Sequence, residues 1–146
     1  MKITTGTEKD LKEWVDARNN LWPIKELQVH ELELRELLES DSFFSFLAKD
    51  DNNKVVGFLE AFIRPFANGC EKKPVMFLEG IWVDPDQRNK ELGRKLLDHL
   101  QNTAKERGFL EIGSDCDISN ETSQLVHQKW GFKETERVVY YRKSLE

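Results

Sequence analysis

The sequence has few of the residues that build disulfide scaffolds or metal centres. Its 146 residues include two cysteines, Cys70 and Cys116, and three histidines. Two cysteines so far apart argue against a disulfide framework. No group of cysteines and histidines has the spacing of a zinc site. We therefore expect neither a disulfide framework nor a metal cofactor.

Long apolar runs and an excess of positive charge are also missing. No apolar run approaches the roughly 20 residues that a membrane-spanning helix needs, and residues 1–8 lack the apolar core of a signal peptide. The 22 basic and 27 acidic residues give a formal net charge of −5, whereas nucleic-acid phosphates require a basic face. These absences predict a cytoplasmic protein without a membrane or nucleic-acid partner. The negative charge is compatible with a cationic ligand.

The residues that are present are typical of a small globular protein, with 38% hydrophobic and 34% charged residues. The length is enough for one core, so we predict one domain over residues 1–146. Periodicity and turn residues predict strands at 2–5, 43–48, 54–63, 75–83, 109–112 and 137–142, and helices at about 8–20, 27–38, 91–107 and 120–130. This order predicts an α/β fold, a mixed sheet with helices on both faces.

Four residues are predicted to mark helix ends. The side chains of Thr7 and Ser119 suit N-caps, because their hydroxyl groups can accept a hydrogen bond from the first helical turn. Gly108 and Gly131 stand where two helices end, and glycine is favoured there because it adopts a positive φ at no steric cost.

The stretch from Val75 to Leu97 predicts a ligand site. An apolar run ends at Asp84-Pro85, a short basic loop follows, and leucines then recur at helical spacing. The first N–H groups of such a helix have no intrahelical partner, and the helix dipole favours negative charge, so this geometry binds phosphate. An ordinary strand–helix connection has the same pattern, and the stretch alone does not separate the two.

Two motifs in order resemble the GCN5-related N-acetyltransferase (GNAT) superfamily. Residues 88–93 (RNKELG) match its signature Gln/Arg-x-x-Gly-x-Gly/Ala after a strand, and Asn120 precedes a helix that ends in Gly-Phe. Five further segments resemble the aminoglycoside 6′-N-acetyltransferases, namely 21–23 (LWP), 77–80 (FLEG), 114–115 (SD), 127–128 (HQ) and 131–141 (GFKETERVVYY). The resemblance covers essentially the whole chain. It implies a mixed, mostly antiparallel central sheet and a homodimer.

The resemblance also implies acetyl-CoA as co-substrate. The pantetheine arm is expected to pair with the backbone of residues 81–83 and to contact Asn120, and the pyrophosphate to lie over residues 88–94. The expected cofactor-binding residues are Ile81, Trp82, Val83, Arg88, Asn89, Lys90, Glu91, Leu92, Gly93, Arg94 and Asn120.

Glu91 departs from the family pattern, which has glycine at this position. A positive φ at a non-glycine residue costs about 1 kcal/mol, and a carboxylate repels pyrophosphate unless it turns outward to Lys95. A helical φ at Glu91 would make the substitution harmless. We therefore expect an effect on cofactor affinity rather than on the fold.

Acetyl transfer to an amine requires that a bound ammonium lose a proton, which a carboxylate can accept. The matched carboxylates are Glu79, Asp115 and Glu136, of which the resemblance implies that Glu136 reaches the neighbouring subunit. Glu79 interrupts an apolar strand, where an unpaired charge is expensive. Asp115 follows a strand, at the edge where ligands of α/β proteins gather, although a turn aspartate is the ordinary alternative.

Three further residues are implicated by the resemblance. Trp22 and Phe66 resemble aromatics that flank the sugar rings. His127 stands where many acetyltransferases have a tyrosine that protonates the departing thiolate, and an imidazole can do the same near neutral pH. A helix histidine that forms hydrogen bonds near the pantetheine is the alternative. The expected catalytic pair is thus Asp115 and His127.

The sequence therefore predicts an enzyme that transfers acetyl from acetyl-CoA to the 6′-amine of aminoglycosides, a reaction that confers antibiotic resistance. One alternative is the same chemistry on another amine, such as a polyamine or a protein lysine. The other is a non-catalytic acyl-CoA-binding domain, which Glu91 favours.

Overall fold

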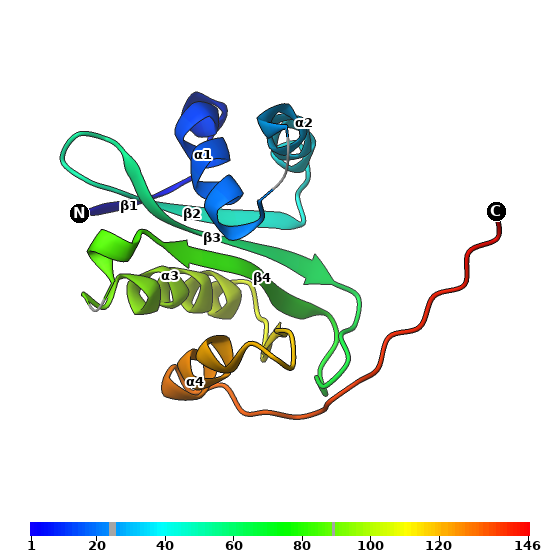
Figure 1. Cartoon of the computed structure of the whole chain (residues 1–146). Helices are drawn as coiled ribbons and strands as arrows, with labels where there is room; N and C mark the ends of the chain where they lie inside the picture. Colours follow the sequence, from blue (N-terminus) through cyan, green and yellow to red (C-terminus); the bar gives the residue numbers. More distant parts are fainter. Residues whose placement is uncertain (24–25, 89) are drawn as a thin grey trace.

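The fold is a five-stranded sheet covered by two helices on each face (Figure 1). The computed structural model describes residues 1–23, 26–88 and 90–146. Strands β1 to β4 pair antiparallel in chain order, and β5 pairs parallel to β4. The predicted mixed, mostly antiparallel sheet is thus confirmed. The elements are β1 (Lys2–Thr5), a 3₁₀ turn (Glu8–Asp10), α1 (Leu11–Leu21), α2 (Leu27–Leu37), β2 (Phe43–Lys49), β3 (Val55–Arg64), β4 (Val75–Val83), a second 3₁₀ turn (Pro85–Gln87), α3 (Leu92–Glu106), β5 (Ile112–Ser114) and α4 (Glu121–Lys129).

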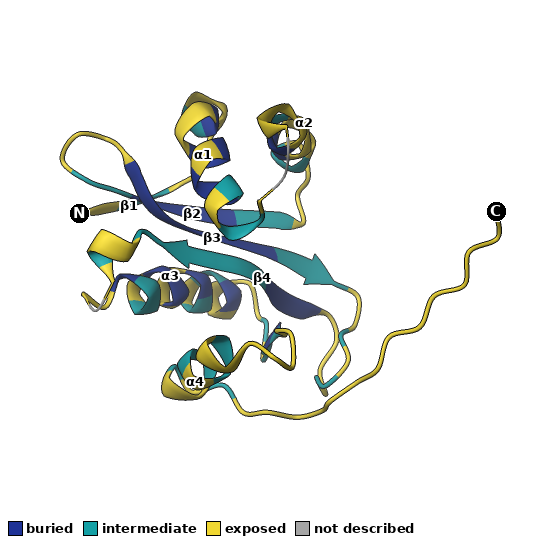
Figure 2. Cartoon of the chain, viewed as in Figure 1, coloured by how far each residue is buried: buried dark blue, intermediate teal, exposed yellow. Residues whose placement is uncertain are grey.

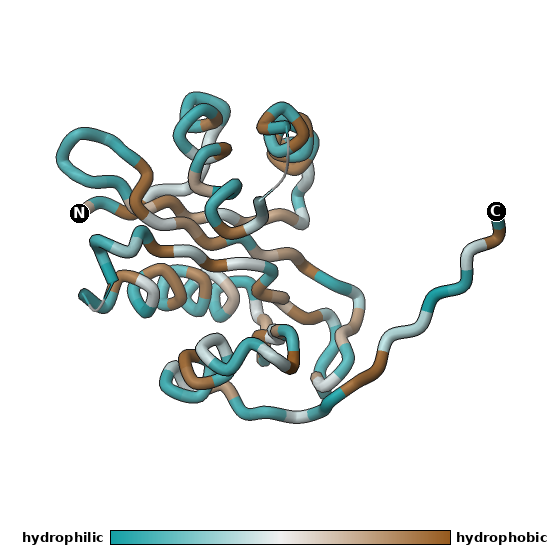
Figure 3. Tube along the Cα trace, viewed as in Figure 1, coloured by the Kyte–Doolittle hydropathy of each residue, from teal (hydrophilic) through white to brown (hydrophobic). Residues whose placement is uncertain are grey.

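Each face of the sheet has its own apolar core (Figure 2). On one face, α3 buries Leu92, Leu96, Leu97, Leu100 and Ala104, the five positions whose spacing predicts the helix. On the other face, α1 buries Leu11, Trp14 and Val15 together with Arg18. Apolar residues follow the strands and the inner sides of these helices in Figure 3.

The end of α3 explains why β5 begins later than predicted. Gly108 has φ 82°, its N–H donates to the Lys105 carbonyl (3.0 Å), and the Phe109 N–H donates to the Ala104 carbonyl (2.9 Å). This pair of bonds is a Schellman motif, which satisfies carbonyl groups that the helix end leaves free. Because the motif uses the backbone of Phe109, the predicted strand 109–112 is wrong, and β5 spans Ile112–Ser114.

The N-cap prediction is wrong for α4. Asn120 is the N-cap, and its side-chain oxygen accepts a hydrogen bond from the Ser123 N–H at 3.0 Å. The Ser119 hydroxyl instead donates to Asp117 at 2.6 Å. Thr7 precedes a 3₁₀ turn rather than an α-helix, because α1 starts at Leu11.

The predicted last strand, 137–142, is also wrong. Residues 133–146 contain no helix or strand and are exposed. This C-terminal tail leaves the body of the protein as an extended segment (Figures 1 and 2). Its exposed apolar residues include Val139, Tyr140 and Tyr141, at 75%, 78% and 91% exposure. A strand exists only through pairing with another strand, and the tail does not pair with the sheet of its own chain.

A half-buried ion pair at the start of α1 gives a pH-dependent stability. Lys49 Nζ lies 2.6 Å from the Asp10 carboxylate. Burial raises the pKa of Asp10, but the Lys49 ammonium and hydrogen bonds from Thr7 outweigh it, so the pKa of Asp10 falls below its ordinary value of 3.8. A lowered pKa stabilises the fold above the unfolded-state value, and this contribution is lost as the pH falls through the folded-state value.

We expect Asp10→Asn to lower the free energy of unfolding at pH 7 by about 1–2 kcal/mol. The difference from wild type should vanish below the lowered pKa of Asp10, where both side chains are neutral. Urea denaturation at pH 7 and at an acidic pH below the lowered pKa of Asp10 checks both statements. Asp16→Asn on the exposed side of α1 is the control, and a gap that stays constant between the two pH values would disprove the assignment.

Candidate active site

Strands β4 and β5 separate at the centre of the site. They pair only from Met76 to Leu78 on β4 and from Ile112 to Ser114 on β5. Beyond this point β4 continues to Val83 and pairs only with β3. The backbone of residues 81–83 therefore has one edge free of any strand within the described residues. An extended ligand can pair with such an edge as an added strand.

A bulge in β4 sets the position of Glu79. Gly80 pairs with Glu60 and Leu78 pairs with Ala61, which leaves Glu79 as the extra residue. Bulges re-aim a side chain and are frequent next to active sites. The Glu79 carboxylate is bonded to Arg64 at the end of β3, with Nε 3.1 Å away. Arg64 thus balances the charge that would be expensive in this strand if it were unpaired.

Glu79 and Asp115 lie next to each other in the register, at the point where β4 and β5 separate. Leu78 and Ser114 are the last matched pair of β4 and β5, and Glu79 and Asp115 are the next residues on these parallel strands. Asp115 is exposed and Glu79 is half-buried. Two carboxylates at the opening between the strands can hold a cation.

Trp22 lies on the same part of β4. A Cβ atom on Gly80 would come within 2.3 Å of the Trp22 ring, so the indole packs directly on the backbone beside Glu79. Only glycine at position 80 allows this approach. Among the predicted site residues, Trp22, Glu79 and Asp115 are thus brought together.

His127 is held by hydrogen bonds at both ring nitrogens. Nδ1 lies 2.7 Å from the Ser123 carbonyl, which can only accept, so Nδ1 carries a proton. In the neutral ring Nε2 then accepts from the Ser114 hydroxyl at 2.7 Å. His127 is thus joined to the residue that precedes Asp115.

The turn after β4 prepares the start of α3. The first intrahelical bond runs from the Lys95 N–H to the Glu91 carbonyl (3.0 Å), which leaves the N–H groups of residues 92–94 without intrahelical partners. The Arg88 guanidinium donates to the Val83 carbonyl (3.0 Å), and Arg94 donates to the Lys129 carbonyl at the end of α4 (2.9 Å). Both side chains are thus fixed near the turn.

Glu91 has φ 62° and ψ 14°, so it adopts the left-handed conformation. A helical φ would have made glutamate harmless at this position, where the family has glycine, but the φ of Glu91 is not helical. Its carboxylate lies 3.9 Å from Arg94 rather than beside Lys95. The backbone of this turn is therefore strained where the sequence predicts the pyrophosphate.

We expect Glu91→Gly to stabilise the protein by about 1 kcal/mol, because glycine adopts a positive φ without the Cβ clash. The Kd of acetyl-CoA should fall about threefold, since the change also removes a negative charge beside the phosphate site. Thermal unfolding and calorimetric titration measure the two effects. Asn53→Gly, at the other non-glycine residue with a positive φ in the described residues (φ 65°), is the control, and it should leave the Kd of acetyl-CoA unchanged.

The remaining predicted residues lie at the edge of the site, or outside the residues that the structure describes. Asn120 uses its side-chain oxygen to cap α4. Phe66 is 65% exposed on the loop between β3 and β4. Glu136 is exposed in the C-terminal tail, next to Thr135, which lies against Gly69 of the same loop. Asn89 falls outside the described residues, and Lys90 is exposed.

Arg64 is a site residue that the sequence reasoning missed. Its guanidinium lies 3.6 Å from the centroid of the Phe77 ring and is bonded to Glu79. The available signal was its alternation with Glu60 and Phe62 on β3, which places the three side chains on one face of the sheet.

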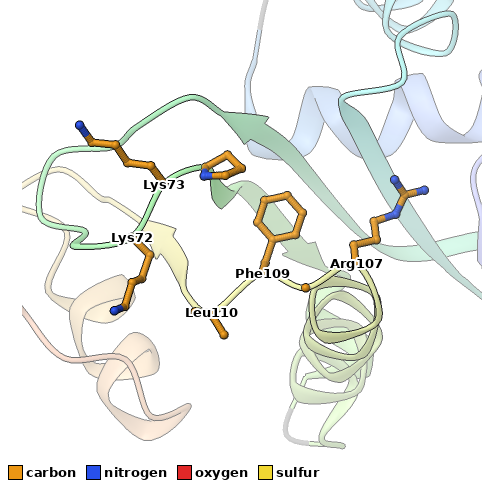
Figure 4. Close-up of a pocket in the computed structure, with 7 residues that line it drawn as sticks. Lys72, Lys73, Arg107, Phe109 and Leu110 are labelled. Carbon is orange, nitrogen blue, oxygen red and sulfur yellow. The ribbon is translucent and has the colours of Figure 1, made fainter.

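Two hollows lie outside this site. One, of about 180 Å³, lies between Lys72 to Pro74 and the residues after α3 (Figure 4). The Lys72 and Lys73 amines point away from the Arg107 guanidinium in this view, so the three cations do not converge on one ligand. The other, of about 660 Å³, lies beside the free end of β2 between α2 and α3.

Membrane-spanning helices and metal clusters are both absent from the part of the chain that the structure describes. None of the helices in that part of the chain combines the length and apolarity needed to cross a bilayer. No three His, Cys, Asp or Glu side chains in the same residues are arranged to hold a metal ion.

Comparison with known proteins identifies the family. The sequence profile of the acetyltransferase (GNAT) family matches residues 9–132. The chain belongs to this family. The acetyltransferase is 41% identical over 137 residues to aminoglycoside N(6′)-acetyltransferase type 1 of Serratia marcescens, a match that covers 93% of this chain and 94% of the relative. It is 39% identical to the protein of that name from Salmonella enteritidis, with 98% and 99% covered.

Solved structures agree with these relatives. The acetyltransferase superposes with a TM-score of 0.92 on AAC(6′)-Iy in complex with the bisubstrate analog CoA-S-monomethyl-acetylneamine, at 38% identity over 98% of this chain and 97% of the other. The TM-score is 0.94 for the aminoglycoside antibiotic 6′-N-acetyltransferase AAC(6′)-Ih from Acinetobacter baumannii, at 37% identity and 99% coverage of both. The GNAT fold predicted from the motifs is thus confirmed.

Proposed function

We propose that this protein is an aminoglycoside 6′-N-acetyltransferase that uses acetyl-CoA and confers resistance to these antibiotics. The observation that carries the proposal is the opening between β4 and β5, where a free strand edge lies beside Glu79 and Asp115. The full-length similarity to named aminoglycoside N(6′)-acetyltransferases supports it. The free edge suits the pantetheine arm, and the two carboxylates suit an ammonium-bearing sugar.

The N-terminus of α3 is assigned to the pyrophosphate. The unpartnered N–H groups of residues 92–94 and the positive end of the helix dipole attract negative charge. Arg88, Lys90 and Arg94 add positive charge around the same turn, while Glu91 opposes it. Asn120 is assigned a contact with the pantetheine. Its side-chain oxygen caps α4, and its side-chain N–H groups remain available to donate to a ligand.

Each site residue is assigned one step of the reaction. Asp115, directly or through water, takes a proton from the 6′-ammonium, and the neutral nitrogen attacks the thioester carbonyl. Glu79 and the Trp22 ring hold the sugar in place, which accounts for much of the rate through proximity. His127 first takes up a proton from solvent at Nε2, which then donates to the Ser114 hydroxyl 2.7 Å away. As the carbon–sulfur bond breaks, the thiolate takes the Ser114 hydroxyl proton, Nε2 replaces it, and His127 returns to its neutral form.

A panel of amines tests the function. Thiol release from acetyl-CoA should follow addition of tobramycin or kanamycin, and should be much slower with spermine or a lysine peptide. Turnover of spermine with both antibiotics untouched would favour the first alternative. Thermal stabilisation by acetyl-CoA without transfer to any amine would favour a non-catalytic acyl-CoA-binding domain, which the strained Glu91 supports.

The proposal includes a homodimer in the cytoplasm. The tail exposes Val139, Tyr140 and Tyr141 in an extended conformation, while β5 pairs only with β4 and leaves its other edge free within the described residues. An extended apolar segment and a free strand edge on the same chain suit exchange between two copies. Glu136 would then reach the site of the partner, and Phe66 would lie where the partner's tail arrives.

Gel filtration with light scattering tests this assembly. The full chain should elute as a dimer, and a chain that ends at Arg137 should elute as a monomer. A truncated chain that stays dimeric would show that the tail does not join the subunits. The double variant Lys143→Ala/Glu146→Ala keeps the apolar tail residues and is the control.

A further inference from the structure

A chain of buried polar side chains lies between the sheet and the helices α1 and α2. Glu60 of β3 is 1% exposed. Its carboxylate accepts hydrogen bonds from Trp14 Nε1 (3.1 Å) and Arg18 Nε (2.9 Å). Arg18 also donates to Glu33 of α2 (2.9 Å). Burial raises the pKa of Glu60, and the Arg18 guanidinium opposes this rise.

The geometry of this chain fixes the tautomer of His30, which is also buried. Arg18 Nη1 lies 3.4 Å from His30 Nδ1, and a guanidinium can only donate, so Nδ1 accepts. The proton of the neutral ring is then on Nε2, which donates to the Trp22 carbonyl at 3.0 Å. The chain of hydrogen bonds thus runs from the sheet to the residue that ends α1.

Trp22 is held at two further points. Its N–H donates to the Arg18 carbonyl (2.8 Å), and the Arg18 guanidinium lies 5.2 Å from the centroid of its ring. The ring itself packs on Gly80, which is the register partner of Glu60. The series of contacts therefore starts at Glu60 and ends at Gly80, and these two residues are paired in the sheet beside Glu79.

Stability alone does not account for this arrangement. Replacing a buried ion pair by apolar residues of similar volume is often neutral or stabilising, because burial of charge costs several kcal/mol. What hydrogen bonds provide and apolar contacts do not is direction. Here the directed bond from His30 ends on the Trp22 carbonyl, and the Arg18 guanidinium lies over the ring of the same residue.

We infer that Arg18 and His30, anchored on Glu60, are positioning residues that hold Trp22 against the sugar of the substrate. The inference rests on the proposed function, in which Trp22 flanks the aminoglycoside. It assigns to the α1–α2 face a role in substrate affinity with no role in acetyl-CoA binding or in proton transfer.

The test is a comparison of His30→Leu with His30→Gln. Leucine removes both hydrogen bonds, and the KM for tobramycin should rise about tenfold, which corresponds to about 1.4 kcal/mol. The kcat and the KM for acetyl-CoA should stay within twofold. Glutamine keeps a donor near the position of Nε2 and should restore the KM to within threefold of wild type. His99→Leu on α3 is the control and should change none of these constants, because this exposed residue contacts the Phe46 ring and none of the described residues around Trp22.

The Trp22 indole N–H resonance, assigned with Trp22→Phe, gives a second measurement that needs no substrate. It should shift or broaden in His30→Leu and stay near its wild-type position in His30→Gln. If wild type does not acetylate tobramycin, the proposed function fails, and this resonance alone decides whether His30 holds Trp22. If the leucine variant does not fold, Glu60→Gln replaces it, with an expected rise in KM of about threefold. An unchanged KM and an unmoved resonance in a folded variant would overturn the inference.

Discussion

Asp115→Asn should lower the kcat for tobramycin by about a hundredfold, the lower end of what a positioned general base contributes. Asparagine keeps the shape of the side chain but cannot accept the proton of the ammonium. Because Asp115 follows the last paired residue of β5 and takes no part in the turn that precedes α3, the Kd of acetyl-CoA should change less than twofold. Steady-state kinetics and calorimetric titration measure the two constants.

The neighbouring Asp117 provides the matched control. Hydrogen bonds from the Ser119 hydroxyl and N–H lower the pKa of Asp117 and tie its carboxylate into the turn before α4. Asn can accept the same bonds, so Asp117→Asn should leave kcat within twofold of wild type. Equal losses of turnover and of acetyl-CoA binding in Asp115→Asn would contradict the assigned role.

Glu79→Gln should raise the KM for tobramycin about thirtyfold, while kcat changes only a fewfold. A hydrogen bond between charged groups contributes about 2 kcal/mol, which corresponds to roughly thirtyfold in affinity. The structure adds a second effect, because the substitution leaves the Arg64 guanidinium without its carboxylate, close to the bound ammonium. Two positive charges at short distance repel each other.

A double variant separates the two effects. Glu79→Gln/Arg64→Gln removes both charges, so the repulsion disappears and the KM should lie between those of wild type and Glu79→Gln. Such coupling is expected for residues in direct contact. A double variant with a KM above that of Glu79→Gln, or a Glu79→Gln variant with the KM of wild type, would contradict this account of the carboxylate.

Much of the fold could be predicted because its signals are local. The strand 75–83 is a run of apolar residues between turn residues, interrupted only by Glu79 and Gly80, and β4 has these bounds. The five inward positions of α3 follow the helical period, and all five are buried. Gly108 ends α3 with a positive φ, as its position predicts.

The errors come from interactions that a local pattern does not contain. Residues 137–142 have strand-forming side chains, but a strand forms only by pairing with an edge elsewhere, and these residues do not pair with the sheet of their own chain. Ser119 and Asn120 are both favourable N-cap residues. The Ser119 hydroxyl donates to the Asp117 carboxylate, and the Asn120 side chain caps α4. The start of β5 was shifted by the Schellman motif of the preceding helix.

The sequence indicated which residues belong to the site, but only some of the interactions between them. Glu79 stood out as a charge in an apolar strand, but its partner Arg64 is 15 residues away, across the β3–β4 pair. No pattern in the sequence indicated a role for His30, because its partners lie on a different helix: Arg18 is in α1 and Trp22 follows its last residue. These pairings are set by register and packing, which follow from the assembled sheet.

The central claim is that the opening between β4 and β5 joins acetyl-CoA to the 6′-amine of an aminoglycoside. Neomycin and paromomycin differ only in carrying an amine or a hydroxyl group at the 6′ carbon, so they form a matched pair of substrates. Initial rates of thiol release from acetyl-CoA should be rapid with neomycin and at the background level with paromomycin. Equal rates with both compounds, or release with neither, would contradict the account.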